Sequence, residues 1–185
     1  MISSDSKFDH WRRGELDLTD SEYSGYQIFL REGGDPENVP GGQFGGDCFH
    51  CHGEAGLQFT DHLFHNNGLD SVFLMDPGHA WVSGNPLDSG KFRTPTLRNV
   101  ALSAPYMHDG SLKTLWDVVD HYNEGGVSNT WQDPQIIILG LSDDEVDQVV
   151  AFLFSLTDKR FAVENQRSYK AQRPRRTRAK AKGAK

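Results

Sequence analysis

The sequence predicts an all-α domain, on the evidence of three capped helical segments and a long irregular stretch between them. In each helical segment a Ser or Thr stands three residues before an acidic residue, and apolar residues then recur at the spacing of one helix face. In the irregular stretch, residues 53–95, glycine and proline recur too often for long helices. A chain of 185 residues is long enough for one domain with a buried core.

The first helix is predicted to follow a polar leader, residues 1–17, which we expect to lie on the domain. Thr19 and Glu22 form the capping box of this helix, and the glycine pair at 33–34 is expected to end it. Gly25 lies in mid-helix, where glycine costs about 1 kcal/mol relative to alanine. We therefore expect this helix to pack closely against another one.

The second helix is predicted to begin after Thr114, which pairs with Asp117 in a weaker form of the same cap. Its apolar residues follow the i, i+3, i+4, i+7 pattern. Tyr122 lies in the middle of the resulting apolar face, His121 lies near its edge, and the glycine pair at 125–126 ends the helix.

The last helix is predicted to begin after Ser142, which forms a capping box with Glu145, and to end near Leu156. A short apolar segment precedes these two helices and lies between turns at Pro95 and Pro105. The helices and the stretch that separates them delimit one domain, residues 18–158.

Charge is divided unevenly along the chain. Residues 159–185 hold 11 Lys and Arg and a single acidic residue, Glu164, whereas the rest of the chain holds 8 basic and 25 acidic residues. This tail shows no periodicity and is predicted to be disordered. We expect this tail either to dock on an acidic partner or anionic lipid, or to fold back on the acidic body of the domain as a solubilising tail. Nucleic-acid binding is disfavoured because no aromatic platform accompanies the charge.

The motif with the most specific chemistry is Cys48-Phe49-His50-Cys51-His52. The pattern C-x-x-C-H is typical of covalent haem c attachment. Two thiols one helical turn apart can each bond a vinyl group on one porphyrin edge, and the next histidine then binds the iron as the proximal ligand. A redox pair or half of a zinc site is the alternative, but no βαβ pattern and no second cysteine pair supports either. We expect one haem.

The haem also predicts the compartment, because c-type attachment is made outside the bacterial cytoplasm and implies a periplasmic protein. The first residues contain no apolar signal-peptide core, and no apolar run reaches the 18 residues typical of a membrane span. We therefore expect a processed chain, a fragment or a mis-started gene.

Three histidines, His62, His65 and His79, lie in the irregular stretch. Each is a possible iron ligand, although a surface or hydrogen-bonded histidine is the more common case.

Five runs of sequence support a more specific interpretation: FRTPTLRNVALSAPYMHDGSLKTL, VVDHYN, LSDDEVDQVVAFLFSLTD, CFHCHGEAGLQFTDHLFHNNG and FDHWRRGELDLTDSEYSGYQIF. Together they cover roughly residues 8–157. This region resembles the C-terminal haem domain of bacterial di-haem cytochrome c peroxidases and of methylamine-utilisation (MauG-like) proteins. The resemblance implies a cytochrome c-like fold with loops wrapped around the haem, and redox chemistry on peroxide or a related oxidant.

The chain departs from this family in one respect: members carry two C-x-x-C-H motifs, and this chain has one. In the family the N-terminal haem usually reacts with peroxide, and the C-terminal haem supplies it with electrons. We therefore expect the electron-transfer half of such an enzyme. Its partners are a redox protein that gives or takes electrons and the missing N-terminal haem domain. A stand-alone mono-haem electron carrier is the alternative, and a sensor with an open iron site is a third.

The sixth iron ligand has two main candidates. Met107 is a natural one, because a thioether favours reduced iron, although methionine also fills gaps in cores. The resemblance implies Tyr122 instead, at the position where the peroxidase branch places a methionine and the MauG-like branch a tyrosine. A packed tyrosine bonded to a neighbour, a histidine ligand or an open site are the remaining alternatives.

Arg98 and Thr96 lie close to the predicted haem edge, where they are candidates to bind a haem propionate. Arg98 is equally suited to holding a loop through backbone carbonyl groups.

The resemblance implies two further features. It places His108 near the haems, either as a relay of electrons or protons or as a residue that fixes the turn through Asp109. It also places a calcium ion between two domains, on backbone oxygens near Ser103 and Pro105, with the remaining ligand in the domain that is missing here.

Overall fold

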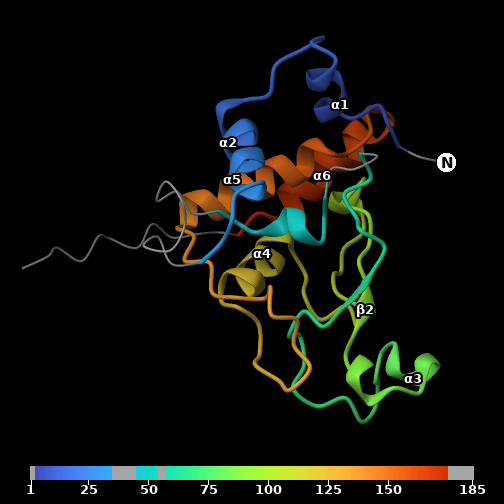
Figure 1. The fold of residues 1–185 in the computed structure, drawn as a ribbon. Coiled ribbons are helices and arrows are strands. Elements are labelled where there is room, and N and C mark those ends of the chain that lie inside the picture. Colours follow the sequence, from blue (N-terminus) through green and yellow to red (C-terminus); the bar gives the residue numbers. More distant parts are fainter. Residues whose placement is uncertain (1–2, 35–44, 54–56, 175–185) are drawn as a thin grey trace, which may run out of the picture.

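The fold is mostly helical, in agreement with the predicted all-α class (Figure 1). The computed structural model describes residues 3–34, 45–53 and 57–174. Its helices are α1 (Lys7–Arg12), α2 (Asp20–Phe29), α3 (Ala80–Ser83), α4 (Leu115–Asn123), α5 (Asp143–Ser155) and α6 (Ala162–Gln172). Short 3-10 turns η1 (Cys48–His50), η3 (Pro86–Asp88), η4 (Val100–Leu102) and η5 (Lys159–Phe161) connect them. Strands β1 (Phe64–His65) and β2 (Phe92–Arg93) form one antiparallel pair.

Helix α5 forms the centre of the helical layer, with α2 and α4 packed against it (Figure 1). Helix α6 packs against η4, the short apolar segment that the sequence predicts between two prolines. The loops after η1, together with β1, β2 and α3, extend from this layer toward the end of the molecule opposite α1. Among the described residues, none of the helices combines the length and the apolar composition needed to cross a bilayer.

The three predicted capping boxes are confirmed, at the N-termini of α2, α4 and α5. In each box the Ser or Thr side chain accepts a bond from a backbone N–H, and the acidic side chain three residues later accepts one in return. The weaker pair, Thr114 and Asp117, forms as complete a box as the others. A fourth box at α1, between Ser6 and Asp9, lies in the leader and was not predicted.

Helix α2 ends at Phe29, earlier than the glycine pair that was expected to end it. The reason is a pair of bonds from the segment that leads into the haem motif. The amide of Gly46 donates to the carbonyl of Ile28 at 2.7 Å, and the amide of Asp47 donates to that of Arg31 at 3.0 Å. These bonds occupy the carbonyl groups of Ile28 and Arg31, which would accept bonds from amides of the same helix if α2 were longer.

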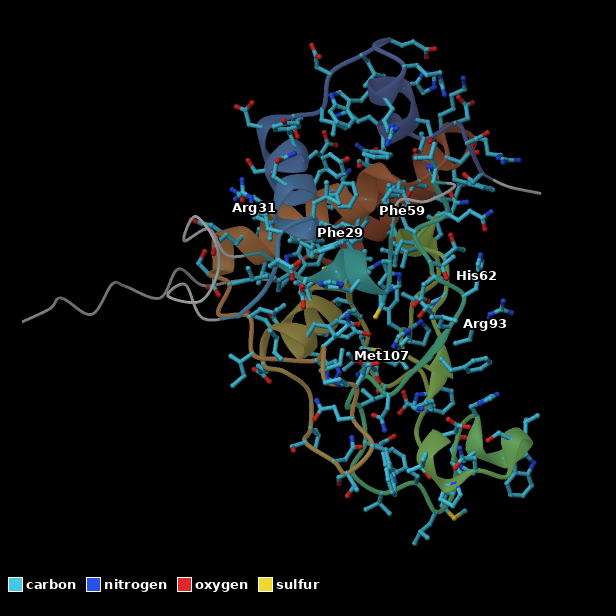
Figure 2. The ribbon with its side chains drawn as sticks, viewed as in Figure 1. Phe29, Arg31, Phe59, His62, Arg93 and Met107 are labelled. Carbon is cyan, nitrogen blue, oxygen red and sulfur yellow. The ribbon has the colours of Figure 1, made fainter. Side chains whose placement is uncertain are left out.

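Five aromatic rings form the centre of the core: Phe8, Tyr26, Phe29, Phe59 and Phe152. Neighbouring rings meet mostly edge to face, with centroids between 5.1 and 6.0 Å apart. They come from α1, α2, the loop after the haem motif and α5, so this cluster joins all four segments. Figure 2 shows Phe29 and Phe59 beside the central helices.

The leader is part of the core, whereas the sequence predicts only that it lies on the domain. Phe8 of α1 is 0% exposed, and the buried Asp9 beside it forms two 2.8 Å contacts with the guanidinium of Arg98. A short run with a single buried aromatic residue carries no helical periodicity, which is why its packing was not predicted.

The basic tail also differs from the prediction, because η5 and α6 fold its first part, up to residue 174. Residues 175–185, on which the rest of the prediction falls, lie outside the described residues.

Helix α6 is attached mainly by polar bonds, which hydrophobic patterning does not reveal. The buried side chain of Gln172 donates to the carbonyl of Ala101 at 3.2 Å and accepts from the amide of Leu115 at 2.9 Å. Tyr169 adds an edge contact with Phe154, with the ring centroids 5.0 Å apart.

The expected close packing at Gly25 is confirmed. An added Cβ would lie 1.8 Å from the carbonyl oxygen of Gln148 in α5, closer than any real contact. We expect Gly25→Ala to lower the free energy of unfolding by about 3 kcal/mol or more, because α2 and α5 must separate to admit a methyl group. Chemical denaturation of the haem-loaded protein measures the change. Ser21→Ala, on the exposed face of the same helix, is the control, and similar losses in both variants would contradict the packing argument.

The ion pair between Asp9 and Arg98 gives a second prediction. Burial raises the pKa of Asp9, but the bonds from Arg98 and Ser6 outweigh burial, so this pKa lies below its ordinary value of 3.8. The pair therefore stabilises the fold above about pH 4 and loses this effect as the pH falls through the native pKa. We expect Asp9→Asn to cost about 3–5 kcal/mol at neutral pH, because it leaves a buried guanidinium without its charge partner.

Urea denaturation between pH 3 and 7 tests this expectation. The difference between wild type and Asp9→Asn should shrink as the pH falls. Glu15→Gln, which removes a carboxylate from an exposed pair with Arg13, should have a much smaller effect at neutral pH. A constant difference across the pH range would contradict the assigned role of the Asp9 charge.

Candidate haem site

The motif residues form one tight turn. Residues 48–50 form η1, and the amide of His52 donates to the carbonyl of Cys48 at 2.8 Å, so the two cysteines lie one turn apart. Both cysteines are half-buried and free of disulfides. Burial raises the pKa of the Cys48 and Cys51 thiols to about 12, so both are neutral thiols at physiological pH. This spacing suits two bonds to one porphyrin edge.

The imidazole of His52 is oriented by one backbone acceptor. Its Nδ1 lies 2.9 Å from the carbonyl oxygen of Phe59, an atom that can only accept, so Nδ1 carries the proton. Nε2 is then left with a lone pair for a metal. Burial lowers the pKa of His52 and keeps it in the neutral form that binds metals.

Both candidates for the sixth ligand meet at one side chain, Asn67. Its amide Nδ2 lies 3.1 Å from the phenol oxygen of Tyr122 and 3.4 Å from the sulfur of Met107. Tyr122 comes from α4, and Met107 comes from the loop between η4 and α4. Figure 2 shows Met107 toward the middle of the molecule, whereas His62 and Arg93 lie at its outer edge.

The phenol of Tyr122 is buried and hydrogen-bonded to Asn67. Burial raises the pKa of Tyr122, and the bond from Asn67 opposes that change. The donor set therefore consists of two thiols, an imidazole nitrogen, and an oxygen or sulfur donor. These residues fit a haem c, with Cys48 and Cys51 for the thioether bonds and His52 for the iron.

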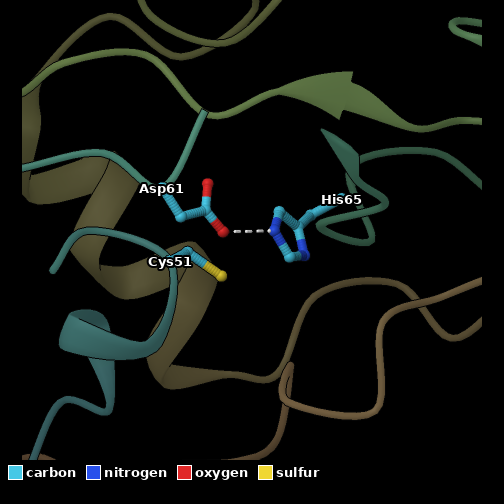
Figure 3. Close-up of side chains that lie close together, drawn as sticks. All are labelled: Cys51, Asp61 and His65. Carbon is cyan, nitrogen blue, oxygen red and sulfur yellow. Dashed lines mark hydrogen bonds and ion pairs between the residues drawn. The ribbon is translucent and has the colours of Figure 1, made fainter. Parts of the chain in front are cut away.

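Both ring nitrogens of His65 are hydrogen-bonded, as expected for a structural histidine. Figure 3 shows one of these bonds, to Asp61, beside Cys51. Its ring lies 2.8 Å from a carboxylate oxygen of Asp61 and 2.6 Å from one of Asp133. Burial lowers the pKa of His65, but the two carboxylates outweigh burial and raise it overall. Asp61 is tied to the motif in turn, because its amide donates to the carbonyl of Cys51 at 2.9 Å. His65 thus fixes the loops beside the haem motif.

The other two histidines of the irregular stretch lie nearer the surface. The side chain of His62 is exposed. The ring of His79 stacks on Phe64, with the centroids 4.0 Å apart, and lies 3.6 Å from a carboxylate oxygen of Asp88.

Arg98 holds loops, which is one of its two predicted roles, and its contacts give no support to propionate binding. Its side chain is 5% exposed and is committed to Asp9. Its Nε donates to the carbonyl of Leu57 at 2.6 Å, and its guanidinium lies 5.4 Å from the centre of the Phe59 ring. Arg98 therefore joins α1 to the loop that leads from the haem motif to Phe59.

Thr96, like Arg98, bonds to the loop that follows the haem motif. Its hydroxyl donates to the carbonyl of Gln58 and accepts a bond from the amide of Arg98 at 3.2 Å. The first bond joins residues 38 positions apart and the second is local. Propionate binding by Thr96 stays a prediction.

His108 stacks on Phe92, with the ring centroids 3.7 Å apart and an angle of 10° between the planes. Its Nε2 lies 3.8 Å from a carboxylate oxygen of Asp70. The carboxylate of Asp109 accepts a bond from the amide of Ser111 at 2.9 Å within this turn. A role for His108 in fixing the turn through Asp109 stays a prediction. A relay role for His108 stays a prediction.

Sequence reasoning did not single out Asn67. The residue lies in the run FHNNG, which was used only as part of the family resemblance. No spacing rule links it to Tyr122, which lies 55 positions later in the sequence. Its contacts form only in the folded chain, where the segments that carry Asn67, Met107 and Tyr122 come together.

Comparison with known proteins gives a consistent result. The family model for cytochrome c matches residues 41–157. A cytochrome-c peroxidase of Denitromonas iodatirespirans is 32% identical, with 85% of this chain and 45% of the relative covered. The methylamine utilization protein MauG of Paracoccus denitrificans is 30% identical, with 91% and 50% covered. The chain thus spans about half the length of the curated relatives it matches.

Solved structures agree with these relatives. A MauG-like protein associated with microbial copper homeostasis superimposes with a TM-score of 0.72 and 35% identity, covering 85% of this chain and 49% of that one. The diheme peroxidase BthA of Burkholderia thailandensis gives a TM-score of 0.65 and 25% identity, covering 85% and 47%.

The two thiols allow a direct test of covalent attachment. We expect the single variants Cys48→Ala and Cys51→Ala to keep a covalent haem through the remaining cysteine, at reduced yield. The double variant should lose it altogether, because no other cysteine is present in the chain. Haem staining of denaturing gels measures this. A haem band in the double variant would contradict thioether attachment at this motif.

Proposed function

The chain belongs to the cytochrome c family, and on that premise we propose that it is the electron-transfer half of a di-haem peroxidase or MauG-like oxidoreductase. Haem c is the cofactor that the family and the donor set support, and we propose a single haem in this chain, at residues 48–52. In this proposal the chain takes no part in breaking the peroxide bond. It passes electrons to a second haem domain that does so.

The observation that carries this proposal is the meeting of Tyr122 and Met107 at Asn67. The chain contains a proximal ligand, His52, and two donors of the kinds that serve as distal ligands. If the chain's own side chains held the iron on both sides, no position on it would be open to peroxide. An unchanged ligand set also keeps structural change during electron transfer small.

We assign the distal position to Tyr122. When bound, the haem supplies one-electron redox chemistry at its iron. The residues of the chain orient and supply the ligands. The carbonyl of Phe59 orients His52, and Tyr122 supplies a buried oxygen donor. An anionic oxygen ligand stabilises higher oxidation states of iron and lowers its potential, which suits the MauG-like branch of the family.

The missing peroxide-reacting haem belongs, in this proposal, to an N-terminal domain of the same family. The support is that the chain aligns with only about half of each relative. We place the working protein in the periplasm, because bacteria attach haem c outside the cytoplasm. Its other partner is a redox protein that supplies or accepts electrons.

Optical spectra of the haem-loaded protein, oxidised and reduced, test the ligand assignment. We expect the oxidised wild type to lack the weak far-red band typical of histidine–methionine haem c. Tyr122→Phe should change the spectrum, and Met107→Leu should leave it nearly unchanged. Two exposed residues provide matched controls, Tyr23→Phe and Met75→Leu, which should match the wild type.

Two results would contradict the proposal. A far-red band in the wild type that is lost only in Met107→Leu would exclude the tyrosine ligand and indicate a conventional electron carrier. A high-spin spectrum that neither substitution changes would indicate an open iron, and peroxide turnover by this chain alone would then replace electron transfer as its expected activity.

A further inference from the structure

We propose that Asn67 is a positioning residue that selects Tyr122 over Met107 as the distal ligand. The inference rests on the proposed function, because it assumes a haem whose sixth ligand comes from this chain. It goes further by naming the side chain that decides between the two candidates. Three sets of contacts support it.

The first set fixes which end of the Asn67 amide faces the two candidates. Its oxygen Oδ1 accepts a bond from the backbone amide of Leu69 at 3.3 Å. An N–H donor must face an acceptor, so this contact leaves the NH₂ end pointing the other way. The two N–H groups of that end have two acceptors, the oxygen of Tyr122 at 3.1 Å and the sulfur of Met107 at 3.4 Å.

The second set fixes the backbone of Asn67 relative to α4. Its carbonyl oxygen lies 3.0 Å from Nε2 of His121, the residue that precedes Tyr122 on the helix. The next carbonyl, of Gly68, accepts from the amide of Val127 at 2.6 Å, just beyond the end of α4. The backbone of residues 67–68 is thus bound to α4 just before Tyr122 and to the segment just after the helix, which limits movement of the Asn67 amide along α4.

The third observation concerns Met107. Its backbone φ is 71°, in the left-handed region that favours glycine, within a turn closed by the bond from the amide of Tyr106 to the carbonyl of Leu112 at 2.6 Å. The sulfur of Met107 therefore approaches Asn67 from a tightly constrained loop. The Nδ2 amide of Asn67 contacts this sulfur and also bonds to the phenol oxygen of Tyr122.

The two bonds differ in strength. A donor aimed at an oxygen that carries negative charge forms a strong, charge-assisted bond, whereas a thioether sulfur is a weak acceptor. The amide therefore stabilises Tyr122 as an anionic ligand more than it stabilises any state of Met107. Without the amide, the phenol oxygen loses this support and the sulfur is released. Both effects favour Met107.

Two substitutions of similar size test this inference in the haem-loaded full chain. Asn67→Leu removes both donors, and Asn67→Asp keeps the shape but offers no N–H. The control is Asn123→Ala near the end of α4. The amide of Asn123 binds the backbone of Leu141 at 2.9 and 2.7 Å, and the substitution loosens α4 without removing a contact to either ligand candidate.

We expect both Asn67 variants to gain the far-red histidine–methionine band, with a shift of about tenfold or more in the ratio of tyrosine to methionine ligation. Because a thioether favours reduced iron, the reduction potential should rise in both variants. Adding Met107→Leu should remove the new band. Asn123→Ala should keep the wild-type spectrum and potential.

The outcomes separate the two proposals. If Tyr122→Phe changes the wild-type spectrum but both Asn67 variants keep it, the selector role is overturned and the tyrosine ligand stands. If the wild-type spectrum is indifferent to Tyr122→Phe, both proposals fail. If Asn67→Leu does not load haem, the spectrum of Asn67→Asp decides whether Asn67 selects the ligand. If Asn123→Ala reproduces the spectral changes, a loosened α4 explains them, and the selecting role of Asn67 is also overturned.

Discussion

The candidate haem site depends on one residue, Phe59, which contacts His52 through its carbonyl oxygen and the core through its ring. Its carbonyl oxygen accepts the bond from Nδ1 of His52 and so leaves the lone pair on Nε2, the nitrogen that we propose binds iron. Its ring is fully buried among the aromatic side chains of α1, α2 and α5. The orientation of the proposed iron ligand therefore depends on the packing of the core.

The loop that carries Phe59 is held in place by the buried ion pair of Arg98 and Asp9. Burying two charges is costly, and such a pair is tolerated when good geometry and further bonds satisfy both groups. Here the guanidinium makes two contacts of 2.8 Å with Asp9 and another bond to the carbonyl of Leu57. As a result, a helix near the N-terminus helps to fix the loop that carries the Phe59 carbonyl group.

The distal side is built differently, from donors of unlike chemistry around one amide. An oxygen ligand lowers the potential of a haem and a thioether raises it, so the choice between Tyr122 and Met107 separates two kinds of redox protein. In this chain both donors lie within 3.4 Å of the Asn67 amide nitrogen. In the proposed site, a small rearrangement beside Asn67 would exchange an oxygen donor for a sulfur donor without a change in the helices.

The sequence by itself determined the features that depend on neighbouring residues. The haem motif, the caps of three helices and the close packing at Gly25 follow from short-range chemistry, and the family is recognisable from contiguous runs. The tertiary structure decided what joins distant segments. Phe8 enters the core, Gln172 anchors α6, Arg98 binds a residue 89 positions away, and Asn67 meets Tyr122 across 55. Polar contacts at such separations leave no periodic trace in a sequence, because they need only one residue from each segment.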